Sequence, residues 1–144
     1  MTAQRESLIT ATLKAMNTDD TFLRTYGNLA LAVEQAHLAA MREHVRGSAI
    51  YYSLLTTSNG GVARVLTNPC RFQVTNTNNH FDCDMTAEGS SLATFILAIN
   101  HLAWDEHAKG NDSGLGFLVG QQELLTDYLY QGHPEGPTIL RFLD

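Results

Sequence analysis

The chain has 144 residues, of which 44% are hydrophobic and 17% are charged, and its formal net charge is −6. No apolar run approaches the ~20 residues of a membrane-spanning helix, and the N-terminus lacks the basic and apolar regions of a secretory signal. We therefore expect a single domain over 1–144, in the cytoplasm, that buries a core without disulfides or metal.

Charge is divided unevenly along the chain. Residues 1–72 hold seven basic and five acidic side chains, whereas residues 73–144 hold two basic and ten acidic ones. A nucleic-acid-binding surface needs clustered Lys and Arg, so no direct sequence-specific nucleic acid binding is expected. An acidic imitation of DNA is an alternative, although ten scattered carboxylates do not reproduce one charge per ~1.7 Å of duplex axis.

Helical patterns come first along the chain. Residues 4–16 predict a short helix, and residues 21–45 predict a longer one. Gly27 weakens a helix interior by about 1 kcal/mol relative to alanine, so the longer helix is expected to start near Asn28. Gly47 is the expected C-terminal stop.

Four strands are expected next, joined by short turns into an antiparallel meander. The segments rich in β-forming residues are 49–57, 62–67, 70–75 and 80–85. Asn59 and Gly60 predict a hairpin turn because both tolerate positive φ. Cys70 and Cys83 fall among these strands and are expected to be reduced core thiols, with a disulfide as the less favoured alternative.

The most apolar helix is expected directly after the last strand, over about 87–107. Thr86 suits the N-cap position, and Glu88 suits the positive end of the helix dipole. The apolar side chains recur at the i, i+3, i+4, i+7 spacing of one buried face; they are Leu92, Phe95, Ile96, Ile99 and Leu102.

A second C-terminal helix is predicted after a polar connection over 109–116. It covers 117–131 and ends at Gly132. The closing segment predicts a proline-initiated turn or two of helix with its large apolar side chains packed inward. Together the elements predict an α+β fold, in which a meander of three to four strands packs with about four to five helices.

Two groups of side chains have the chemistry of metal ligands. His80, Asp82 and Asp84 share one side of a strand, which leaves a metal-dependent enzyme open as an alternative. The second group lies on the long apolar helix and comprises His101, Asp105 and His107. It lacks the His-Glu-x-x-His pattern of a zinc helix, and an exposed polar face is the favoured interpretation of both groups.

Motifs of nucleophilic catalysis and of phosphate binding are absent from the sequence. There is no Gly-x-Ser-x-Gly, no Gly-x-Gly-x-x-Gly and no Gly-Lys-Ser/Thr, and neither cysteine has a local catalytic signature. The residues alone therefore predict no catalytic site, no metal and no cofactor, and binding to another protein is the expected role.

Three blocks of sequence resemble the ArdB/KlcA antirestriction family. They are SNGG (58–61), MTAEGSSLATFILAINHLA (85–103) and HPEGPTILRFLD (133–144). Their order and spacing match the family over most of the chain, and Ile139, Arg141 and Asp144 stand at its closing positions. The run before the hairpin and residues 62–69 depart from the family pattern. The resemblance therefore implies that this chain is a divergent member of the family.

The resemblance implies a non-enzymatic protein of a plasmid, phage or integrated mobile element that relieves type I restriction-modification of incoming DNA. It implies contact with the restriction machinery or interference with its movement, and leaves a homodimer open. Asp144 is the leading candidate for interaction, because its side chain and the terminal carboxylate bring two negative charges together. Pairing with Arg141 is the structural alternative. The hairpin supplies the remaining candidates: Asn59, Gly60 and Gly61.

Overall fold

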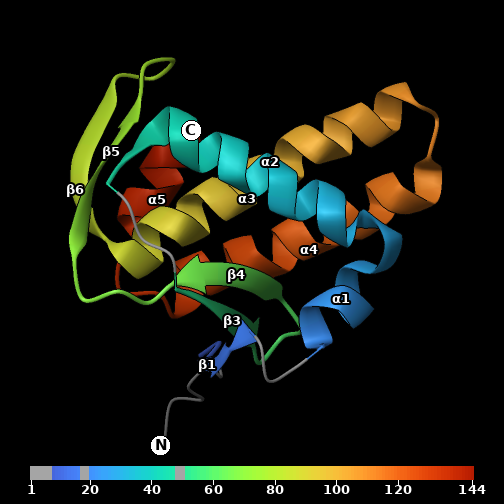
Figure 1. Ribbon diagram of the computed structural model, residues 1–144, viewed down its shortest axis with the longest axis horizontal. Helices are drawn as coiled ribbons and strands as arrows, with labels where there is room; N and C mark the ends of the chain where they lie inside the picture. Colours follow the sequence, from blue (N-terminus) through green and yellow to red (C-terminus); the bar gives the residue numbers. More distant parts are fainter. Residues whose placement is uncertain (1–7, 17–19, 48–50) are drawn as a thin grey trace, which may run out of the picture.

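The computed structural model describes residues 8–16, 20–47 and 51–144. Its elements are β1 (Ala11–Ala15), α1 (Thr21–Tyr26), a 3-10 turn η2 (Gly27–Leu29), α2 (Ala30–His44), β2 (Val45–Arg46), β3 (Tyr52–Thr57), β4 (Val62–Leu66), β5 (Arg71–Asn76), β6 (Phe81–Thr86), α3 (Ala87–Ala108), α4 (Asp112–Gln131) and α5 (Gly136–Leu143). In Figure 1 the strands β1, β3 and β4 lie below α2 and α3, with α1 to their right, and β5 and β6 lie on the left of the molecule. The α+β class is confirmed.

The strands form two antiparallel sheets, with the orders β1-β3-β4 and β2-β5-β6. The β3–β4 and β5–β6 hairpins are as predicted, but the pairing of β4 with β5 in one meander is wrong. Pro69 lacks a backbone donor and disfavours a helical conformation at Asn68, so this connection does not form a tight hairpin. Each sheet instead gains its third strand from an earlier part of the chain.

The predicted helix over 4–16 is wrong where the structure describes it. Ala11–Ala15 is strand β1, which pairs antiparallel with β3, so that Ala11 lies opposite Thr57 and Ala15 opposite Ser53. Pairing with a strand more than 35 positions away satisfies its backbone groups, and this tertiary interaction overrides the helix propensity of the segment. Residues 4–7 lie outside the described ranges.

The predicted interruption at Gly27 is confirmed. Its φ is +55°, α1 ends just before it, and α2 begins at Ala30. Gly47 is not the stop of α2, because the helix ends at His44 and Val45 already pairs with Val74 in β5. The strand expected from residue 49 is seen from Tyr52 onward, and its first residues fall outside the described ranges.

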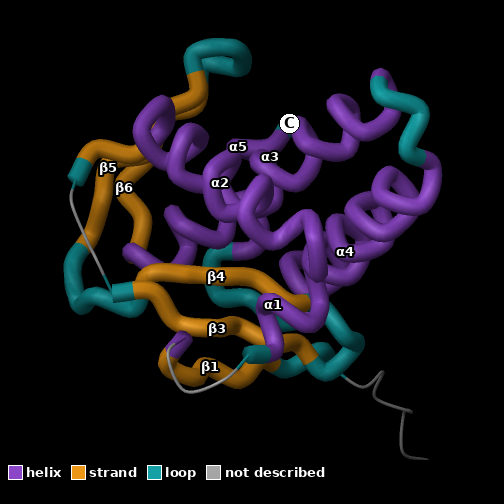
Figure 2. Tube along the Cα trace, turned by 45° about the vertical axis from the view of Figure 1, so that its right-hand side comes forward, coloured by secondary structure: helices purple, strands orange, loops and turns teal. Residues whose placement is uncertain are grey.

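Helix α3 lies at the centre of the molecule. It begins as predicted, with Thr86 Oγ1 accepting a hydrogen bond from the Gly89 N–H at 3.0 Å. Helices α2 and α4 pack on it, and β4 also contacts it, as Figure 2 shows from a second direction. The five apolar side chains expected to share its buried face are all buried: Leu92, Phe95, Ile96, Ile99 and Leu102.

Helix α4 begins earlier than predicted. The Asn111 side chain caps it by accepting from the Gly114 N–H at 3.3 Å, so the expected connection shortens to three residues. Gly132 ends this helix as predicted. Helix α5 carries a proline in its first turn and buries Ile139 and Phe142, as the closing segment predicts. Within the described ranges, no helix is both long and apolar enough to cross a membrane.

Both cysteines are free thiols. Cys83 is partly buried on β6, whereas Cys70 is exposed. The placement of Cys70 in the core is therefore wrong, because this residue belongs to the connection between the two sheets and not to a strand.

Candidate functional site

The β3–β4 hairpin is fastened to α4. The Asn59 amide donates to the Leu124 carbonyl at 3.0 Å. Gln121 donates to the Gly60 carbonyl at 3.3 Å and accepts from the Val62 N–H at 2.9 Å. The side chain of Asn59 is therefore held between two elements of the fold.

The two hairpin glycines also meet structural needs. Gly60 has a φ of +101°, a conformation that side chains disfavour. A Cβ on Gly61 would lie 2.6 Å from Thr57 Oγ1 and 3.0 Å from a methyl carbon of Leu125. The hairpin motif thus allows a close approach to α4.

Arg141 and Asp144 lie where α5 ends over the β5–β6 turn. The Asn79 amide donates to the carbonyls of Arg141 at 3.1 Å and Phe142 at 3.0 Å. Asn76 donates to the Phe142 carbonyl as well, also at 3.0 Å. These bonds satisfy carbonyls that an α-helix leaves unpaired at its C-terminus, and they fix the end of α5 on the second sheet.

A shallow cavity of about 360 Å³ opens at this place, and we name it the C-terminal hollow. Its lining residues are Asn79, His80, Phe81, Asp82, Arg141 and Asp144. The hollow brings the closing residues of the family resemblance together with two of the candidate metal ligands. The Arg141 guanidinium lies over the Phe81 ring, 5.8 Å from its centroid, and among the described ion pairs none joins Arg141 to Asp144.

The acidic side chains of β6 serve as cross-strand partners. Asp82 accepts from the Gln73 amide at 2.7 Å. Asp84 accepts from Arg71 Nε at 2.6 Å, and this hydrogen bond raises the pKa of Arg71. His80 stands in the turn with a φ of +59°.

No metal centre is assembled from the residues that the structure describes. Nowhere in these ranges do three or more His, Cys, Asp or Glu side chains gather closely enough to hold an ion. This applies to the β6 group and equally to the exposed side chains on α3, which are His101, Asp105 and His107.

A cluster that no pattern in the sequence predicts joins the second and third blocks of the family resemblance. Glu135 accepts from the Thr86 N–H at 3.2 Å and from the Thr86 hydroxyl. His133 Nδ1 accepts from the Glu135 N–H at 2.9 Å, so its proton lies on Nε2, 2.6 Å from the Glu88 carboxylate. We name Thr86, Glu88, His133 and Glu135 the α3 clamp.

The α3 clamp is a structural device. It holds two carboxylates at the positive end of the α3 dipole, where negative charge is stabilising. The His133 side chain is only 1% exposed. A Cβ on Gly89 would overlap the Glu135 carboxylate. The partners are separated by 45 to 49 positions along the chain. The one sequence signal that relates them is that all four residues lie in the second and third blocks of the resemblance.

Replacing Glu135 by alanine is expected to lower the free energy of unfolding by about 2 kcal/mol, because it leaves the Thr86 N–H without its charged acceptor. Urea unfolding monitored by circular dichroism measures this. Glu123→Ala, which removes an exposed carboxylate on α4, should cost less than about 0.5 kcal/mol. Gly89→Ala should be less damaging in the Glu135→Ala background than alone; strictly additive costs would contradict the clamp.

Comparison with known proteins bears on the whole chain. No protein-family model and no curated protein sequence matches it. Its structure is similar to a solved structure from work on the KlcA and ArdB proteins, with a TM-score of 0.82 and 25% sequence identity. The alignment covers 99% of this chain and 100% of the other. That work describes a novel fold and antirestriction activity against type I DNA restriction systems in vivo but not in vitro.

The sequence blocks and the similarity of fold indicate the same relationship. The three sequence blocks resemble the family, and they occupy one connected part of the molecule: the hairpin packs on α4, α4 leads into the clamp, and the clamp holds the start of α3. The similarity of fold extends over essentially the full length of both chains. The chain is a divergent ArdB/KlcA-like protein.

Proposed function

We propose that this protein relieves type I restriction-modification of incoming DNA. The observation that carries the proposal is the full-length similarity to a KlcA/ArdB structure for which activity against type I systems is described. The clamp supports it as well, because it joins two of the resemblance blocks, so residues that carry the resemblance also hold this fold together. The protein would act in the cytoplasm of a host cell and would be carried by a plasmid, phage or integrated element.

The proposed mechanism is contact with the restriction machinery, or interference with its movement, without catalysis. Polar groups of the α3 clamp and of β6 are engaged in structural bonds, which leaves surface contact as the favoured mode. A DNA mimic would compete for the DNA groove of a purified enzyme as well as in a cell. The related activity is described in vivo but not in vitro, which favours a mechanism that needs a further component of the cell.

A plating assay tests the proposed function. Unmodified phage are plated on a host with an active type I system, with and without expression of the protein. Relief is expected as a higher plating efficiency, whereas phage already modified by that system should plate equally on both. Normal accumulation of the protein without any relief would overturn the proposal.

Asp144→Ala is expected to reduce relief about tenfold, the effect of losing one charge-assisted contact with a partner. Asp144 is exposed at the end of α5, so the melting temperature should not change. Asp105→Ala removes another exposed carboxylate, on α3, and should leave relief intact. Full relief by the Asp144 variant would remove this residue from the proposed contact surface.

A further inference from the structure

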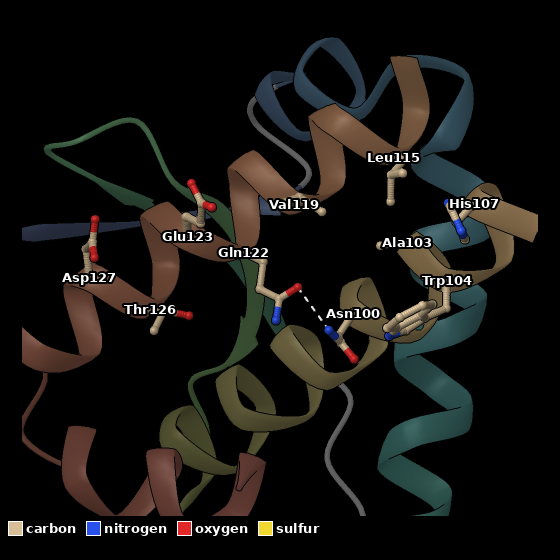
Figure 3. Close-up of a pocket in the computed structure, with 10 residues that line it drawn as sticks. All are labelled: Asn100, Ala103, Trp104, His107, Leu115, Val119, Gln122, Glu123, Thr126 and Asp127. Atoms are coloured by element: carbon tan, nitrogen blue, oxygen red, sulfur yellow. Dashed lines mark hydrogen bonds between the residues drawn. The ribbon is translucent and has the colours of Figure 1, made fainter. Parts of the chain in front are cut away.

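A long groove runs between α3 and α4, and neither the resemblance nor the residue patterns pointed to it. Its volume is about 610 Å³. The lining residues, drawn in Figure 3, are Asn100, Ala103, Trp104, His107, Leu115, Val119, Gln122, Glu123, Thr126 and Asp127. We name it the α3–α4 groove. A hydrogen bond of 3.2 Å from the Asn100 amide to Gln122 Oε1 crosses it and ties the two helices together.

Most of the exposed surface inside the groove is apolar. Trp104 is 66% exposed and Val119 is 38% exposed, and Ala103 and Leu115 lie on the same walls. Trp104 projects into the opening in Figure 3, with its ring set edge-on to His107. Tryptophan is enriched at protein interfaces because its large ring has an apolar body and a polar N–H.

The charge of the groove selects the kind of partner. Glu123 and Asp127 are exposed along the α4 side, and the lining contains no Lys or Arg. The whole chain carries a net charge of −6. A second copy would bring further negative charge to these carboxylates, whereas a basic partner would neutralise them.

The shape of the groove selects the secondary structure of that partner. Both walls are helices whose backbone groups are bonded internally, and neither offers a strand edge to pair with an extended peptide. A bound helix satisfies its own backbone. The α4 wall runs from Leu115 to Asp127, a length of about 18 Å at 1.5 Å per residue, which accommodates three turns of a helix.

We propose that the α3–α4 groove is a docking site for a basic amphipathic helix of a partner protein. The helix would place its apolar side chains against Trp104 and Val119 and its Lys or Arg side chains beside Glu123 and Asp127. That the partner belongs to the restriction machinery rests on the proposed function; the binding of such a helix does not.

A fluorescence titration tests the binding. Trp104 is the only tryptophan of the chain, so its emission reports directly on the groove. The probe is an 18-residue amphipathic helix of Leu and Lys, and the matched control has Glu in place of each Lys. The basic peptide is expected to give a saturable blue shift that weakens with added salt, and the acidic peptide none. Absence of a shift, or equal binding of both peptides, would overturn the proposal.

Variants locate the binding on the groove. Val119→Glu should abolish the shift, and Glu123→Gln with Asp127→Asn should weaken binding about fivefold. Tyr130→Glu places the same new charge on an exposed side chain of α4 outside the groove and should bind as the unaltered protein does. Unchanged binding by Val119→Glu, or a shift produced by self-association without peptide, would overturn the proposal.

The plating assay then separates the two proposals. Val119→Glu is expected to lose relief while Tyr130→Glu keeps it. If the unaltered protein gives no relief, the proposed function fails and the peptide titration still decides the docking site. If the unaltered protein gives relief and Val119→Glu gives the same relief, the groove is not the surface that meets the restriction machinery.

Discussion

Replacing Phe142 by alanine is expected to lower the free energy of unfolding by about 3–5 kcal/mol, the usual cost of truncating a fully buried aromatic residue. Phe142 is 0% exposed. Its ring packs edge-on against Phe81 at 5.5 Å and against His44 at 5.3 Å, measured between ring centroids. One side chain of α5 therefore holds together β6 and the end of α2.

The Phe142 variant should also affect the C-terminal hollow. The Phe142 carbonyl accepts from Asn76 and Asn79, and the adjoining Arg141 lines the hollow together with Asp144. A cavity under α5 is expected to loosen these bonds and to reduce relief of restriction, even at a temperature where the protein remains folded.

Guanidinium unfolding measures the loss of stability. Phe142→Leu keeps most of the apolar volume and should cost about 1–1.5 kcal/mol, while Tyr130→Ala, which truncates a 72% exposed ring, should cost less than about 0.5 kcal/mol. A loss below 1 kcal/mol for Phe142→Ala would mean that α5 contributes little to the core.

Features governed by neighbouring residues could be predicted from the sequence. The start of α3 follows from a threonine cap and an acidic first turn, and its buried face follows from apolar spacing. The split between α1 and α2 follows from the conformational freedom of Gly27. The closing segment turns inward because its apolar side chains need cover, as the burial of Ile139 and Phe142 shows.

Features governed by distant residues could not be predicted in this way. The identity of β1 depends on pairing with residues 53–57, and its own composition favours a helix. The division into two sheets depends on which earlier strand reaches each hairpin. The α3 clamp joins Thr86 to Glu135 across 49 positions, a relation that periodicity does not encode.

The candidate sites divide in the same way. The resemblance identified Arg141 and Asp144 as candidates for interaction. Only the fold reveals that they share a hollow with His80 and Asp82. Asn59 also came from the resemblance, but its amide is bonded to Leu124, so the hairpin motif has a structural explanation. The α3–α4 groove could not be predicted, because its carboxylates have the spacing of any exposed helix face. Only the fold places Trp104 on the opposite wall.

Acidification should destabilise the protein through His37. This side chain is 0% exposed, and its Nε2 donates to the Ser91 carbonyl at 2.9 Å. Its Nδ1 has no partner among the described residues. Burial, followed by the positive charge of Arg64, lowers the pKa of His37 from 6.5 to about 3.

The sign of the effect follows from proton binding. Below pH 6.5 the unfolded chain binds a proton on this imidazole, whereas the folded protein does not bind it until about pH 3. The contribution of His37 to the free energy of unfolding is therefore fully present above pH 6.5, and it falls by about 1.4 kcal/mol per pH unit below that value. The full loss is on the order of 5 kcal/mol, and about 2 kcal/mol is already lost at pH 5, before most carboxylates titrate.

Comparison with His37→Gln isolates this contribution. The glutamine amide can still donate to the Ser91 carbonyl but does not titrate, so the variant should be less stable at pH 7.5 and lose less stability on acidification. Urea unfolding at several values between pH 7.5 and pH 5 should show the two stabilities converging by about 2 kcal/mol. Arg64 faces His37 from β4, and Glu34 lies 3.6 Å from Arg64 Nη1; both side chains are present in the protein and in the variant. Parallel pH profiles would mean that burial does not lower the pKa of His37 in the folded protein.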